Sequence, residues 1–247
     1  MGKASDNDVT SWYSDPDSVA DFDTRIAHVL EHSNELIEGA PKWKDLDEYI
    51  FSFNIQNEGQ GHLNGNVAPV PGWWCDRAEM MRDIMGDSGV LISTGECSLA
   101  VILAMSTTRL TLMTKTGGGN EFPNSDIQEN WACEALDIVN IHSYSGVEEF
   151  RSKGPVALQR ALDANKLMLF EEFGASGEGK AQTLKDHVAV FNDLRVPWMP
   201  WQISKPGNGA NDFEFWTDEE AYGVVKEGAA EAGEQEGAQR FNIKCAE

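Results

Sequence analysis

Basic residues are scarce in this 247-residue sequence. It contains 19 Lys and Arg against 41 Asp and Glu, for a formal net charge of −22. Nucleic acids and anionic membrane surfaces are bound by clustered Lys and Arg. We therefore expect neither as a partner, and a neutral substrate fits the charge balance better.

Long apolar runs are also missing. The run from Leu99 to Met105 (LAVILAM) is far shorter than the roughly 20 apolar residues of a membrane span. The opening segment MGKASDNDVTSWYSDPDS is polar, so it contains no signal-peptide core.

No G-x-G-x-x-G opens a helix after an expected strand, which argues against an NAD-binding protein. His62 and His142 lack partners at metal-ligand spacing, so no metal or cofactor is expected.

Cysteine is limited to four positions, Cys75, Cys97, Cys133 and Cys245. Four cysteines allow three pairings, and an even number in an acidic chain is compatible with secretion. Buried free thiols are an equally good interpretation. The cysteine count alone therefore decides neither the redox compartment nor a disulfide.

What is present is an alternation of two kinds of segment. The chain is long enough for one large domain with a sizeable core, and 41% of its residues are hydrophobic. Runs of β-branched and aromatic residues predict strands at 49–56, 90–93, 138–141, 167–170 and 196–203. Helical periodicity and capping signals predict helices at 15–30, 73–85, 155–165, 181–194 and 219–231. This alternation is typical of βαβ units around a parallel sheet.

Chemically active side chains gather at the carboxyl ends of the expected strands. They are Glu58 in FNIQNEGQGH after the first strand, His142 and Tyr144 after the third, Glu172 after the fourth and Trp201 in the fifth. A (β/α) barrel builds its active site from this end of several separate strands. The charge of Glu58 at the end of a buried strand is therefore explained if Glu58 lies at the rim of a cleft.

Glycoside hydrolysis requires at least two carboxyl groups on such a rim, of which one is protonated and the other ionised. Glu58 and Glu172 are the candidates. In so acidic a chain an isolated Glu is more often a surface charge, but the position of these two at strand ends favours a catalytic role. Asn57 could donate to a sugar 2-hydroxyl, or it could simply cap a turn.

Each remaining candidate has an ordinary structural alternative. His142 could be a satisfied core histidine, but Tyr144 points the same way along an extended chain, which favours a paired position at the rim. Trp201 offers a flat apolar face to a sugar ring, and a role as core filler is equally good.

Together these motifs resemble glycoside hydrolase family 5, whose members are retaining (β/α)8 enzymes. The resemblance is carried by Asn57-Glu58 after a strand, His142-x-Tyr144, FEEFG with Glu172, and Trp201 on the last strand, in the right order from about residue 15 to 225. It implies an α/β fold, an incomplete (β/α)8 TIM barrel with about the last five β/α units. It also implies Glu58 as acid/base, Glu172 as nucleophile, His142 and Tyr144 as residues that orient the nucleophile, and Trp201 as the sugar platform.

The family resemblance further implies an activity. We expect endo-acting hydrolysis of β-1,4-linked polysaccharide, with mannan ahead of cellulose, by double displacement between carboxyl groups about 5 to 5.5 Å apart. Many fungal members are secreted, so an extracellular location is expected. We also expect a monomer whose partner is the polysaccharide or oligosaccharide substrate.

The sequence departs from the family pattern at its front. Five strands are expected instead of eight, and Glu58 would follow the fourth strand of the barrel, so the family's early Arg and His have no counterpart. A truncated gene model or a natural fragment is the expected cause, and low or no activity is expected from this chain. The competing interpretation is a catalytically inactive carbohydrate-binding fragment, in which Trp73, Trp74 and Trp201 hold sugar.

A second departure is the segment 95–117, which has neither turn chemistry nor clean helical caps. Its ends can be encoded by splice-donor and splice-acceptor sequences, so we interpret it as a translated intron, with a buried helix as the alternative. On that hypothesis Cys97 carries no structural meaning, and Cys75 with Cys133 becomes the favoured pair. The expected domain is then 1–225 with an insert at 95–117, followed by an acidic Gly/Ala/Glu tail at 226–247.

Overall fold

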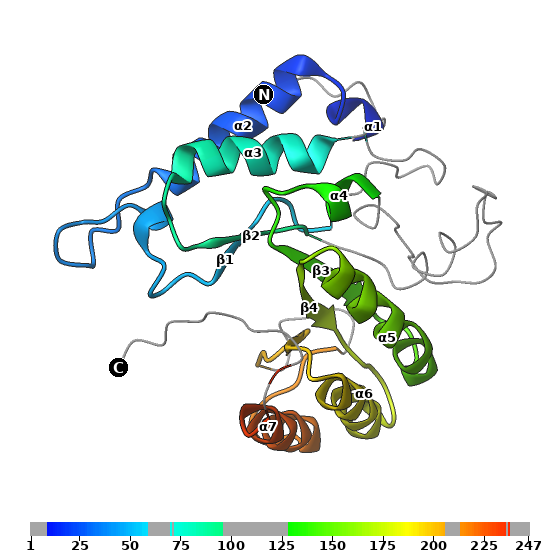
Figure 1. The fold of residues 1–247 in the computed structure, drawn as a ribbon. Helices are drawn as coiled ribbons and strands as arrows, with labels where there is room; N and C mark the ends of the chain where they lie inside the picture. The colour runs from blue at the N-terminus through cyan, green and yellow to red at the C-terminus, as the bar shows by residue number, and fades with distance from the viewer. Residues whose placement is uncertain are drawn as a thin grey trace. The chain divides into compact units, whose positions relative to one another are not determined.

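The computed structural model describes residues 9–58, 70, 72–95, 128–205, 213–235 and 237. Most of the proposed insert at 95–117 lies outside these residues, as do His62, Cys97 and Cys245. The chain divides into two compact units (Figure 1). Of the described residues, the first unit contains 9–58, 70, 72–95 and 128–139, and the second contains 140–205, 213–235 and 237.

Within the described ranges five strands are hydrogen-bonded in chain order, β1-β2-β3-β4-β5. They are β1 (Ser52–Asn54), β2 (Leu91–Ser93), β3 (Ile138–Ser143), β4 (Leu167–Phe173) and β5 (Trp198–Pro200). The helices that alternate with them are α3 (Trp73–Met85), α4 (Gln128–Ala132), α5 (Val147–Asp163), α6 (Lys180–Leu194) and α7 (Glu220–Gly233). The first unit also contains α1 (Val9–Trp12), α2 (Pro16–Leu30) and the 3-10 turn η1 (Trp43–Asp45). Parallel pairing with helical crossovers is the topology of consecutive β/α units, as the alternation predicts.

The first unit is organised around α2 and α3. Asp15 caps α2 by accepting from the Ser18 amide at 2.9 Å, so the predicted start of this helix is confirmed. Trp73 and Trp74 begin α3 and are 1% and 0% exposed, in a core shared with Leu30. Placing Trp73 and Trp74 on a sugar-binding surface was therefore wrong, because neither ring reaches solvent.

A disulfide joins Cys75 in α3 to Cys133, directly after α4. It confirms the pair favoured on the intron hypothesis, and it closes a loop with a sequence separation of 58 residues. Such a cross-link stabilises chiefly by limiting the conformations of the unfolded chain, so its effect grows with loop length.

The second unit has an aromatic core between β4 and its helices. Phe170 of β4 stacks on Phe191 of α6 with ring centroids 4.1 Å apart, and Phe173 lies 4.8 Å from the same ring. Phe150 of α5 joins them at 4.9 Å from Phe191. The register between β4 and β5 shifts between Phe170 and Phe173, where β4 contains one residue more than β5. This extra residue lets both phenylalanines of FEEF occupy the core although they are three positions apart.

Several element boundaries differ from the predictions. β4 continues to Phe173, so Glu172 lies inside the strand and not after it. α5 begins at Val147 instead of residue 155 and contains Pro155, because the additional turns bury Phe150. β5 is limited to Trp198–Pro200, and α7 continues to Gly233, within the range 226–247. Helices α1 and α4 were not predicted.

None of the helices in the described part of the chain combines the length and the apolar character needed to cross a bilayer.

One ionisable side chain is enclosed by the aromatic core. His187 of α6 is 0% exposed, and its ring lies 4.8 Å from that of Phe150. Burial lowers the pKa of His187 below its ordinary value of 6.5, while the Asp186 charge and the Ser145 carbonyl act in the opposite direction. Burial is the largest of these effects, so the pKa of His187 is lowered overall.

Replacing both cysteines in Cys75→Ala/Cys133→Ala should lower the free energy of unfolding by about 4 kcal/mol, the loop-entropy value for this separation. Denaturant titration of the oxidised wild type and the variant measures the difference. The wild type in reductant should match the variant, which itself should not respond to reductant. Equal stability of the oxidised wild type and the variant would contradict a stabilising cross-link.

Acid should destabilise the fold through His187. Below about pH 6.5 the unfolded chain binds a proton that the folded state resists, so stability falls as the pH drops, by up to about 1.4 kcal/mol per pH unit from this one group. His187→Phe should lose less stability than the wild type between pH 7.5 and 5.0 in denaturant titrations. His32→Gln, at an exposed position, should lose as much as the wild type. An unchanged slope in His187→Phe would show that another group is responsible.

Candidate active site

The two acidic residues of FEEFG lie between the two buried phenylalanines of β4. The side chains of Glu171 and Glu172 are 16% and 12% exposed. With Phe170 and Phe173 both held in the aromatic core, the two carboxylates extend away from that core. The local pattern of two apolar residues flanking two acids therefore produces a pair of nearly buried charges.

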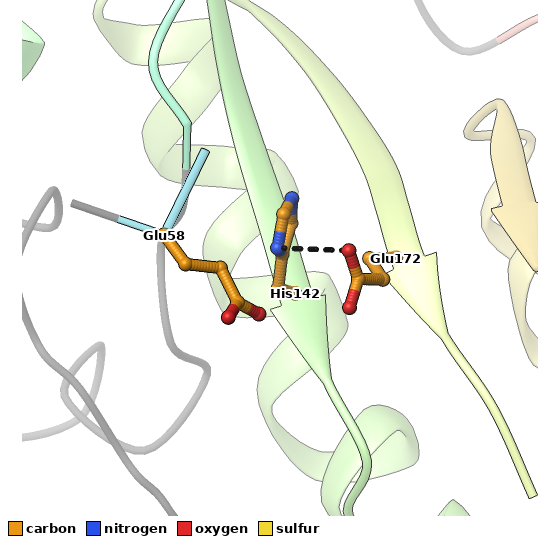
Figure 2. A group of neighbouring side chains, drawn as sticks. All are labelled: Glu58, His142 and Glu172. Carbon is orange, nitrogen blue, oxygen red and sulfur yellow. Dashed lines mark ion pairs between the residues drawn. The ribbon is translucent and has the colours of Figure 1, made fainter. Parts of the chain in front are cut away.

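His142 lies between these carboxylates. It comes from β3, and its side chain is 3% exposed. Its Nε2 is 2.8 Å from Glu171 Oε2, and its Nδ1 is 3.6 Å from Glu172 Oε2, the ion pair drawn in Figure 2. Both ring nitrogens of His142 thus face carboxylates.

Tyr144 contacts the other oxygen of Glu172. It follows β3, and its hydroxyl donates a hydrogen bond to Glu172 Oε1. Its ring packs edge-on against Phe213 at 5.0 Å. Because residues two apart on an extended chain point the same way, His142 and Tyr144 approach the same carboxylate from one strand. The structure therefore brings His142, Tyr144 and Glu172 together within the second unit.

Trp201 follows β5, and its backbone is tied to the end of β4. Its amide donates to the Phe173 carbonyl at 2.7 Å, and its peptide bond to Gln202 is cis. The side chain of Trp201 is 43% exposed, so its ring is not core filler. An exposed aromatic face beside the strand that carries Glu172 is chemically suited to stacking on a sugar.

Gly174 leaves space for this arrangement. A Cβ atom at this position would lie 2.7 Å from the Trp201 carbonyl oxygen and 2.9 Å from the Tyr144 ring. The same atom would lie 2.9 Å from the ring of Phe213. The glycine after Glu172-Phe173 is therefore required by the close approach of Tyr144, the residue that holds Glu172. The FEEFG pattern contained this residue, but the crowding around it is a tertiary feature.

Glu58 and Asn57 follow β1 in the first unit. The Glu58 amide donates to the Gly95 carbonyl at 3.2 Å, and Gly95 approaches the Gln56 backbone so closely that a Cβ atom would overlap it. Glu58 is half-buried with φ of 45°, a left-handed conformation uncommon for this residue type and frequent at functional sites. Asn57 is exposed. The pairing of Glu58 with Glu172 of the second unit stays a prediction.

Comparison with known proteins gives similarity of structure only. No family model and no curated protein matches the sequence. An endo-β-1,4-mannanase from Thermotoga petrophila is similar with a TM-score of 0.66 at 16% identity, over 94% of this chain and 54% of that one. A glycoside hydrolase family 5 mannosidase from Rhizomucor miehei has a TM-score of 0.63 at 13% identity, over 90% and 61%. A Pseudomonas stutzeri endoglucanase has a TM-score of 0.56 at 15% identity, over 90% and 64%.

These similarities establish the fold. They confirm the predicted incomplete (β/α)8 TIM barrel, of which the described residues form five parallel strands. The chain spans about half the length of the Thermotoga petrophila mannanase, 54%.

Adding a methyl group in Gly174→Ala should displace the Tyr144 ring and lower the free energy of unfolding by about 1 to 3 kcal/mol, the usual cost of overpacking. Denaturant titration measures it. The matched control is Gly223→Ala in α7, where a Cβ atom would meet nothing within 4 Å. That control should raise stability by roughly 0.5 to 1 kcal/mol, because alanine favours helix over glycine. A stable Gly174→Ala variant would mean that the crowding is relieved at no cost.

Proposed function

We propose that this chain belongs to glycoside hydrolase family 5 and carries the nucleophile side of a retaining endo-β-1,4-glycanase. The observation that carries the proposal is the state of Glu172, a nearly buried carboxylate held at one oxygen by the Tyr144 hydroxyl and faced at the other by His142. A nucleophilic carboxylate needs this kind of orientation in a largely dry site. Similarity of fold to mannanases and endoglucanases supports the same assignment.

The proposed reaction is a double displacement. Glu172 attacks the anomeric carbon while Glu58, as acid, protonates the departing glycosidic oxygen. Glu58 then removes a proton from water, which releases the sugar from Glu172 with overall retention. This mechanism requires the two carboxyl groups to be about 5 to 5.5 Å apart. The left-handed backbone at Glu58 supports a functional role, because such a conformation costs roughly 1 to 3 kcal/mol.

The remaining residues are proposed to bind the substrate. Trp201 would stack on the sugar at the cleavage point, and Asn57 would donate to its 2-hydroxyl. We favour mannan over cellulose, in keeping with the mannanases among the similar structures. The Cys75–Cys133 disulfide supports an extracellular location, because disulfides persist in oxidising compartments.

A second candidate is a carbohydrate-binding barrel without catalysis. It is favoured by the 43% exposed ring of Trp201, because an exposed aromatic face can stack on a sugar without cleaving it. In this case Trp201 and the residues around Glu172 would hold sugar without cleaving it.

Two measurements distinguish the glycanase from the carbohydrate-binding module. They are reducing-sugar release from mannan and carboxymethyl cellulose, and calorimetric titration of a manno-oligosaccharide. Any hydrolysis by the wild type should fall by at least about 10³-fold in Glu172→Gln, because the nucleophile is lost. Glu178→Gln, at an exposed position after β4, should leave the rate unchanged. Binding of the oligosaccharide without hydrolysis would support the binding module. Absence of both binding and hydrolysis would contradict both candidates.

A further inference from the structure

Glu171 has no role in the double displacement, yet it makes the shorter contact with His142. Its Oε2 lies 2.8 Å from Nε2, whereas Glu172 Oε2 lies 3.6 Å from Nδ1. We propose that Glu171 is a positioning residue that fixes the ring orientation and the Nε2–H form of His142, and so directs Nδ1 toward Glu172. The proposal rests on the proposed function of Glu172 as nucleophile.

The irregular strand explains how two neighbouring residues reach one imidazole. In a regular strand Glu171 and Glu172 would point to opposite faces of the sheet. The register shift between Phe170 and Phe173 interrupts this alternation. A bulge re-aims side chains locally, and bulges are frequent beside active sites. Both carboxylates consequently turn toward His142, one to each ring nitrogen.

The two distances from the His142 ring show which glutamate holds it. A separation of 2.8 Å is a normal hydrogen bond, whereas 3.6 Å is beyond one. The orientation of the His142 ring is therefore set from the Glu171 side. All three side chains are at most 16% exposed, so water competes little for the ring and the charge-assisted bond is effective.

Proton counting assigns the tautomer. An ionised carboxylate only accepts hydrogen bonds, so the nitrogen facing Glu171 must carry a proton. In neutral imidazole this leaves the Nδ1 lone pair toward Glu172, and in imidazolium both nitrogens carry protons. In either state Nε2 is protonated, Nδ1 lies 3.6 Å from Glu172, and the direct hydrogen bond to Glu172 comes from the Tyr144 hydroxyl.

The test is the protonation of the His142 ring in the intact chain, measured by long-range ¹H–¹⁵N correlation spectra of protein labelled at histidine. His142→Gln assigns the signals. In the wild type we expect a protonated Nε2 at neutral pH. In Glu171→Ala the Nε2 proton signal should be lost or the ring should shift toward the Nδ1–H form. Glu171→Gln should restore the wild-type pattern, because its amide oxygen can still accept from Nε2–H.

Glu178→Ala is the matched control, an exposed glutamate outside the cluster, and should leave the ring signals unchanged. An Nδ1–H tautomer in the wild type, or an unchanged ring in Glu171→Ala, would overturn the proposal. If Glu171→Ala does not fold, the wild-type tautomer and the Glu171→Gln spectrum still decide. These spectra need no sugar, so failure of this proposal is distinguishable from failure of the hydrolase assignment. Where hydrolysis is measurable, Glu171→Ala should lower kcat with KM unchanged.

Discussion

The register shift in β4 is the constraint on which the candidate site depends. Phe170 and Phe173 both pack against Phe191, although a regular strand would place them on opposite faces. Their burial fixes the strand on both sides of the two glutamates. Because the aromatic core holds both ends of this segment, Glu171 and Glu172 have little freedom, and a nearly buried pair of charges results.

The neighbours of Glu172 follow from the same constraint. The Phe173 carbonyl accepts from the Trp201 amide, so the end of β4 also fixes the residue proposed to stack on sugar. Gly174 then allows the Tyr144 ring to pass close to the backbone. Orientation of the Glu172 carboxylate therefore depends on the packed end of β4 and on two residues that directly follow β3 and β5, Tyr144 and Trp201.

Much of the fold could be predicted because its signals are local. The helix at 73–85 agrees with α3, and the Asp15-Pro16 signal marks the start of α2, since capping and periodicity act over one or two turns. The start of α5 was wrong because burial of Phe150 depends on β4 and α6, which lie elsewhere in the sequence. Trp73 and Trp74 were misassigned for the same reason, as nothing local distinguishes an exposed ring from a core ring.

The candidate site residues also combine features that are local in the sequence with features that depend on tertiary packing. The order and type of the side chains at strand ends were readable from the sequence, because parallel strands place their carboxyl ends at one edge of a sheet. The contact of Glu171 with His142, the crowding at Gly174 and the left-handed backbone of Glu58 were decided only by tertiary structure. A one-residue change of register moves a side chain to the opposite face of the sheet. Side-chain chemistry is therefore a local property of this chain, and the partner of each charge is a property of its packing.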